Sequence, residues 1–175
     1  MEPGQLGGIS VYQATLPPGT VQAGKFTVTA NGGADVGAFQ ATINVGADIQ
    51  IQTPLAGATL FSAAACALTI NWTGGDPNSW VTMNIVQPDP SAFGGIVEPY
   101  AMLTVQTRAS TGTLTTEPGP FGTCGGSAPE PIQIAIEVDP DPSEIGAFSA
   151  SGLSLGGQVT WRYIHTFQVS IELYY

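Results

Sequence analysis

Apolar and polar residues alternate along several short stretches of this chain, and a period of two predicts β-strands with one buried face. Residues 25–30 and 39–45 are the clearest pair of such stretches, and Phe26 and Val28 share one face of the first. Glycine-rich residues 31–39 join the two stretches. Because glycine adopts the backbone conformations that a tight reversal needs, we predict a β-hairpin here.

The same alternation predicts strands elsewhere in the chain. They are residues 10–16, 49–51, 68–72, 80–86, 102–107, 112–116 and 132–138. The turn-forming residues at 73–78, Thr-Gly-Gly-Asp-Pro-Asn, predict that the strands on either side of them form a second hairpin. Residues 54–65 lack a helix cap signal, and we predict a loop there.

The C-terminal run, residues 158–175, has the most regular alternation in the chain. Its odd-numbered positions from Val159 to Tyr175 carry mostly aromatic and aliphatic residues. A straight strand of this length would span roughly 55 Å at ~3.3 Å per residue, well beyond an ordinary strand. We therefore expect the run to bend, to contain a bulge, or to project from the body of the protein.

Composition fits an all-β protein, since the 175 residues include 23 glycines and 14 prolines and no long run of strong helix formers. The predicted fold is an Ig-like antiparallel β-sandwich with a long C-terminal strand, formed by one domain over residues 1–175. Residues 1–17 are a remnant of, or a lead-in from, an upstream region in this interpretation. The predicted core consists of Phe26, Val28, Phe39, Ile43, Leu68, Ile70, Trp72, Met83, Ile85, Ile134, Ile136, Trp161 and Phe167.

Charge excludes some partners. Three basic residues stand against 13 acidic ones, for a formal net charge of −10. Nucleic acids and anionic membrane surfaces both need clustered Lys and Arg, so neither is an expected partner. No stretch approaches the ~18 apolar residues that span a bilayer, and the first residues lack the features of a signal peptide. Membrane insertion is therefore not expected.

Three segments together resemble a known group of proteins. They are residues 24–43, with the sequence GKFTVTANGGADVGAFQATI, residues 68–77, LTINWTGGDP, and residues 148–155, FSASGLSL. They are similar to the C-terminal β-sandwich region of uncharacterised secreted proteins common in Acidobacteria. The resemblance implies export and a sandwich or Ig-like fold, and it carries no reaction. Ser154 departs from the group's pattern, which has an aspartate in its last segment.

The two cysteines, Cys66 and Cys124, could form a disulfide that closes a long loop if the protein is exported. The alternative is buried or free thiols. In the second case Cys124 could act as a nucleophile with His165, the only histidine, and a carboxylate. The aromatic neighbours Tyr163 and Phe167 favour instead a structural, hydrogen-bonded His165 on a packed face.

Carboxylates offer two further hypotheses. A pair of acids could hydrolyse a glycosidic bond, and the available residues are Glu98, Glu117, Glu130, Glu137 and Glu144. Asp139, Asp141 and Glu144 lie within six residues and provide enough oxygen for a Ca²⁺ loop, although the prolines between them favour a plain acidic turn. No cofactor is expected otherwise.

Aromatic residues could form a platform for sugar rings, as in carbohydrate-binding modules. The candidates are Trp80, Tyr100, Tyr174 and Tyr175, and packing in the core or at a sheet edge is the alternative. From these patterns we expect a secreted or cell-surface, non-catalytic module for adhesion, assembly or surface attachment. It could associate with itself through the C-terminal strand or with another surface protein. A carbohydrate-binding module and a small hydrolase are the alternatives.

Overall fold

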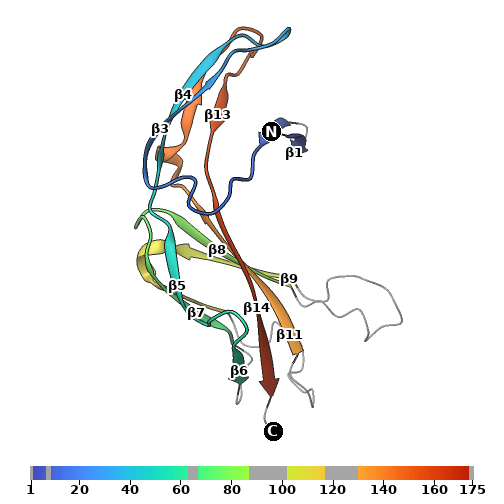
Figure 1. The fold of residues 1–175 in the computed structure, drawn as a ribbon, viewed down its shortest axis with the longest axis vertical. Coiled ribbons are helices and arrows are strands. Elements are labelled where there is room, and N and C mark those ends of the chain that lie inside the picture. The colour runs from blue at the N-terminus through green and yellow to red at the C-terminus, as the bar shows by residue number, and fades with distance from the viewer. Residues whose placement is uncertain (1, 7–8, 63–66, 87–101, 117–129, 174–175) are drawn as a thin grey trace, which may run out of the picture.

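A computed structural model describes residues 2–6, 9–62, 67–86, 102–116 and 130–173, which form strands and two short 3₁₀ turns. The elements are β1 (Glu2–Leu6), β2 (Ile9–Gln13), β3 (Gly24–Ala30), β4 (Phe39–Val45), β5 (Ile49–Thr53), β6 (Thr59–Ser62), β7 (Thr69–Gly74), β8 (Trp80–Val86), β9 (Met102–Arg108), η1 (Ala109–Thr111), β10 (Thr113–Thr115), β11 (Glu130–Asp139), η2 (Pro142–Glu144), β12 (Gly146–Phe148), β13 (Gly157–Val159) and β14 (Tyr163–Leu173). The body is elongated, and the β1–β2 hairpin stands to one side of it (Figure 1).

Two sheets packed face to face form the larger part of the body, which we call the sandwich. One sheet has the strand order β6-β14-β11-β8-β9 and the other has the order β10-β7-β5. All neighbours pair antiparallel except β14 and β6, which run parallel. The all-β, sandwich-like prediction is confirmed, whereas the finer Ig-like topology stays a prediction.

The inner face of β11 lies at the centre of this sandwich. Ile132, Ile134, Ile136 and Val138 alternate along the strand, and each is buried. β11 pairs with β14 on one side and with β8 on the other, so both edges of its backbone are hydrogen-bonded. The three-stranded sheet covers its inner side chains with residues such as Ile70, and the two sheets share one continuous core.

Two further hairpins extend beyond the sandwich, and we call them the arm. β3 pairs with β4 from Gly24 opposite Val45 to Ala30 opposite Phe39, which confirms the first predicted hairpin. β12 pairs with β13, and both pack against β4. The rings of Phe39 and Phe148 stack with their centroids 3.8 Å apart, so the two hairpins share apolar contacts of their own.

The second predicted hairpin is wrong, because β7 and β8 belong to different sheets. The turn at 73–78 carries the chain across the core instead of back along the same sheet. Ile70 on β7 and Met83 on β8 consequently face each other's sheet from opposite sides, and both are fully buried. A chain reversal that stacks two strands face to face buries both apolar faces, which a hairpin with one solvated face would not do.

Another prediction about local structure also needs correction. Residues 54–65 contain β6, which forms because the end of β14 offers an unpaired edge for parallel pairing. In residues 148–155, the third segment of the resemblance, β12 ends at Phe148 and a turn with Gly152 at a φ of 87° follows. The C-terminal run is interrupted between β13 and β14, as its length led us to expect.

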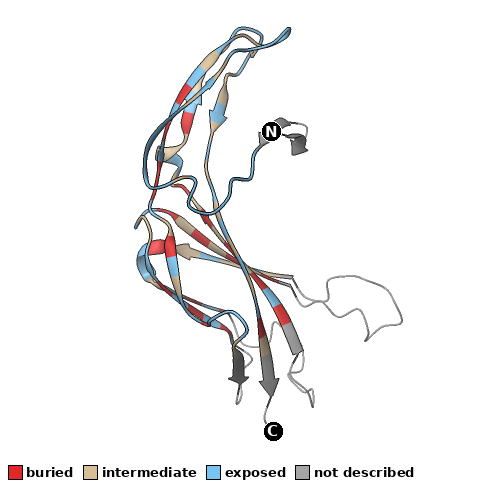
Figure 2. Ribbon diagram, viewed as in Figure 1, coloured by how far each residue is buried: buried red, intermediate tan, exposed pale blue. Residues whose placement is uncertain are grey.

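The predicted core is largely confirmed for the sandwich and largely wrong for the arm. Phe26 is 36% exposed and Val28 is only half-buried, because β12 and β13 pack mainly against β4 and not β3. Phe39, at the start of β4, is also half-buried although its ring stacks on Phe148. Ile43 on β4 is buried, but within the arm and outside the sandwich core. Trp161 and Phe167 pack against the margin of that core and are also half-buried. Figure 2 shows the resulting contrast between β3 and β4.

Gly146 allows the two hairpins of the arm to approach each other, and it provides a test of their packing. A Cβ at this position would lie 2.5 Å from the carbonyl oxygen of Thr42 and 2.6 Å from Ile43 Cγ2. We expect Gly146→Ala to lower the free energy of unfolding by about 1–3 kcal/mol. Gly33→Ala is the matched control, because a Cβ there meets nothing within 4 Å. Urea denaturation of both variants measures the difference, and equal stabilities would contradict the packing.

Candidate functional site

The arm and the sandwich meet where three connections cross, and we call this region the junction. It comprises residues 46–48, between β4 and β5, residues 140–145, between β11 and β12, and residues 160–162, between β13 and β14. The aromatic ring of Trp161 packs tightly against Gly46, where a Cβ would lie 3.1 Å from Trp161 Cζ2. Asp141 and Glu144 lie within the junction, and Asp139 and His165 lie on the strands that enter it.

Trp161, Tyr163 and His165 alternate around the start of β14, and we call them the junction row. Their partners are one residue near the end of β4 and two residues of the β4–β5 connection. Trp161 Nε1 donates to the carbonyl oxygen of Asn44 over 2.7 Å. The hydroxyl of Tyr163 donates to the carbonyl oxygen of Gly46 over 3.1 Å. His165 Nε2 lies 2.9 Å from Asp48 Oδ1.

Electrostatics at the junction row favour its neutral tyrosine. Burial, and then the negative charge of Asp48, raise the pKa of the Tyr163 hydroxyl above its ordinary value. The hydroxyl therefore keeps its proton, which it needs in order to donate to Gly46. In its neutral form the His165 ring donates from Nε2 to the Asp48 carboxylate, and protonation turns this contact into an ion pair.

His165 makes a hydrogen bond of the kind that its aromatic neighbours favoured, with Asp48 as its partner. In a hydrolytic triad of the Ser-His-Asp type, the carboxylate binds one ring nitrogen and the nucleophile lies beside the other. Asp48 occupies Nε2 here, and the side chain of His165 is partly exposed. Cys124 and Cys66 lie outside the described residues, so the disulfide and the nucleophilic hypothesis both stay predictions.

Trp80, the described member of the proposed sugar platform, has one ring face covered. The guanidinium carbon of Arg108, which lies opposite Trp80 in the β8–β9 pair, is 3.7 Å from its ring centroid. Arg108 also bonds the carbonyl oxygen of Asn78 and pairs with Asp141 over 3.0 Å. A sugar ring would have to displace this cation or use the other face. Tyr100, Tyr174 and Tyr175 lie outside the described residues.

The three acids of the Ca²⁺ hypothesis bind or face different groups. Asp139 pairs with Arg162 over 2.6 Å, and Glu137 binds the same guanidinium. Asp141 caps η2 and pairs with Arg108. In the part of the chain that the structure describes, no three His, Cys, Asp or Glu side chains form a group suited to a metal ion.

Two carboxylates near the junction have pKa values shifted in opposite directions. Hydrogen bonds from the backbone N–H and the hydroxyl of Ser143, followed by Arg108, lower the pKa of Asp141. Burial, and then the charge of Asp76, raise the pKa of Glu144. The Oε2 atom of Glu144 is buried without a hydrogen-bond partner among the described residues. The ionised form of Glu144 therefore lowers the stability of the fold.

The far end of the arm is made by two of the segments that carry the sequence resemblance. The N–H of Gly37 donates to the carbonyl oxygen of Ser151 over 2.8 Å, which joins the β3–β4 loop to the β12–β13 loop. Gly152 lies so close to the backbone of Asp35 that no side chain fits there. Leu155 in the second loop is 98% exposed.

Comparison with known proteins gave no match to a family model, a curated protein or a solved structure. Within the described residues, no helix is long and apolar enough to cross a membrane.

Sequence reasoning missed Asp48 and Arg108, the two residues that decide what His165 and Trp80 contact. Asp48 is separated from His165 by 117 positions, so no local pattern relates them. Some of the signal was present, because Trp161, Tyr163 and His165 share one face of the C-terminal run. Each can donate a hydrogen bond, and buried donors need acceptors.

The junction row should act as a unit. Tyr163→Phe removes one hydrogen bond and should lower the free energy of unfolding by about 0.5–1.5 kcal/mol. His165→Ala should do the same, and the double variant should lose less than the sum, because both side chains order the same connection. Thr166→Val, at an exposed position of β14, is the control. Strict additivity in urea denaturation would contradict a coupled row.

Glu144 and Asp141 should affect stability with opposite dependence on pH. The folded-state pKa of Glu144 is raised above its ordinary value of 4.5. As the pH rises from 4.5 through that raised pKa, the Glu144 carboxylate therefore lowers the free energy of unfolding. We therefore expect Glu144→Gln to be more stable than the wild type near neutral pH and equal to it in acid. Asp141→Asn should be less stable near neutral pH. This difference in stability from the wild type should disappear as the pH falls from 3.8 through the lowered folded-state pKa of Asp141. Urea denaturation across this range measures both, and parallel pH profiles would contradict the assignment.

Proposed function

We propose that this chain is a non-catalytic module of a secreted or cell-surface protein that serves adhesion, assembly or surface attachment. The observation that carries the proposal is how the described candidate side chains are used. His165 binds Asp48, Trp80 stacks on Arg108, and Asp139 pairs with Arg162. Each of these contacts joins two segments of the fold, which is what a scaffold requires.

The elongated shape supports the same function. The arm extends from the sandwich (Figure 1). It ends in two loops joined by a backbone hydrogen bond, and Leu155 in one of them is exposed. A body of this shape presents much edge and loop surface relative to its buried core, which suits contacts with other proteins. Resemblance to secreted sandwich proteins is the support for an extracellular location.

Self-association through the C-terminal strand is the specific form of this proposal. β14 pairs with β11 along one edge, and β6 takes its other edge only at Ser170–Leu173. The edge beside residues 163–167 has no strand partner among the described elements, and Ile164 on the outer face is 58% exposed. An open edge beside an exposed apolar residue can pair with another strand.

Light scattering over a range of concentrations tests this proposal. We expect the mass to rise above that of the monomer, and Ile164→Lys to shift the equilibrium towards the monomer at least several-fold. Gln106→Lys is the control, since it adds the same charge to the outer face of the same sheet. Deletion of the strand is unsuitable because Val169 is part of the core. A strict monomer at all concentrations would remove the assembly function.

A further inference from the structure

The two strands of the β3–β4 hairpin differ in how well their inner faces are covered. Ala41 and Ile43 on β4 are 2% and 7% exposed. Their ladder partners on β3 are Val28, which is half-buried, and Phe26, which is 36% exposed. β12 and β13 pack against β4, so they cover the inner side chains of β4 better than those of β3. An apolar strip on β3, made of Phe26, Val28 and Ala30, is left partly open.

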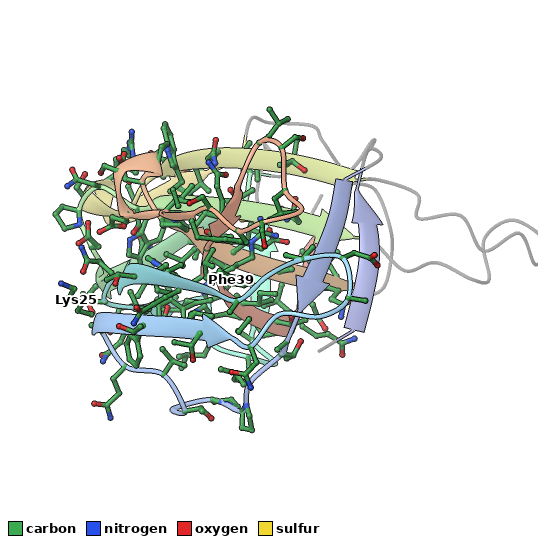
Figure 3. The ribbon with its side chains drawn as sticks, turned by 90° about the horizontal axis from the view of Figure 1, so that it is seen from above. Lys25 and Phe39 are labelled. Atoms are coloured by element: carbon green, nitrogen blue, oxygen red, sulfur yellow. The ribbon has the colours of Figure 1, made fainter. Side chains whose placement is uncertain are left out.

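The outer edge of the same strand is also open. β3 pairs with β4 along its whole length, and within the described residues no strand or loop bonds its other edge. Seen from above, β3 is the outer strand of the hairpin and Lys25 lies near its end (Figure 3). Unpaired backbone groups beside an apolar strip are the features that recruit another strand.

We propose that β3 pairs antiparallel with β3 of a second copy of this chain. This inference rests on the proposed assembly function and names a second surface for it, separate from the open edge of β14. A two-fold axis through Thr27 places Gly24 opposite Ala30 of the other copy, so all seven residues of the strand are paired. In this register Phe26 of each copy lies opposite Val28 of the other. Both half-covered side chains thereby gain an apolar cross-strand neighbour on the same face.

Charge also favours a second copy at this place. The chain has a net charge of −10, so most of its surface repels another copy. From Gly24 to Val45, however, only Lys25 and Asp35 are charged, and their charges cancel. The two-fold register places Lys25 opposite Thr29 of the other copy, so no like charges meet. β3 is therefore an edge at which two acidic chains can approach without local repulsion.

The position of Lys25 opposite Thr29 gives a test that is specific to this register. Thr29 is exposed, so either charge can be introduced there with little effect on the fold. Thr29→Glu creates two symmetric ion pairs with Lys25 and should lower the dissociation constant of the dimer roughly two- to thirty-fold. Thr29→Lys should raise it by a similar factor. Lys25→Glu combined with Thr29→Lys should restore association to the level of Thr29→Glu.

Sedimentation equilibrium of the full chain measures these constants, with Gln40→Glu and Gln40→Lys on the inner strand β4 as controls. Amide hydrogen exchange should show protection of β3 that increases with protein concentration. Association that ignores the charge at 29 but responds to Ile164→Lys would overturn the β3 surface and leave the proposed function standing. A strict monomer in every variant would overturn both. Protection of β3 that is independent of concentration would show that the chain's own segment covers the edge, and would overturn the second copy as its occupant.

Discussion

The sandwich depends on one constraint, the complete burial of one face of β11. Four alternate side chains of β11 are buried in the core: Ile132, Ile134, Ile136 and Val138. A shift of the strand register by one residue would turn all four towards solvent. This fixes the register of β8 and β14, which pair with β11 along both edges. The three-stranded sheet then follows, because it is the layer that covers the resulting apolar surface.

The inner face of β14 also holds the junction together, but it does so through hydrogen bonds. Val169 and Phe167, on the inner face of β14, contact the core, and further towards the arm the same face carries His165, Tyr163 and Trp161. Aliphatic residues give way to side chains that combine an apolar body with a hydrogen-bond donor. Where the second sheet ends, the inner face has backbone carbonyls and Asp48 to meet instead of apolar side chains. The alternation that packs the sandwich thus also fastens the arm to it.

Alternation in the sequence predicted most strands and the residues that share a face, because both follow from the period of two. Neighbour relations were harder to predict. β7 and β8 could pair as a hairpin or lie in different sheets, and either arrangement would bury Ile70 and Met83. The pairing of the other strands decides between the two arrangements. β6 was missed for a related reason, since its pairing with β14 depends on an edge more than 100 positions away.

The candidate site was predictable in its residue types and unpredictable in its partners. His165 was identified as a packed, hydrogen-bonded residue, but its acceptor Asp48 comes from the first third of the chain. Trp80 was a candidate for a sugar platform, with core or sheet-edge packing as the alternative, and Arg108 covers one face of its ring from the next strand, β9. The apolar period also assigned Phe26 to the core. Periodicity gives the direction of a side chain, whereas burial depends on whether another layer reaches it.

The direction in which β3 leaves the junction determines how pairing at β3 would place two molecules. β3 runs from Gly24, which is paired with Val45 next to the junction, towards the far end of the arm at Ala30. Antiparallel pairing of two such strands therefore places the two sandwiches at opposite ends of a continuous four-stranded sheet. Most of the described acidic residues belong to the sandwich or the junction, so antiparallel pairing leaves them farther from those of the other copy than parallel pairing would. Parallel pairing would bring the sandwiches together. The charge of the chain thus selects the antiparallel arrangement, the same one that places Phe26 opposite Val28.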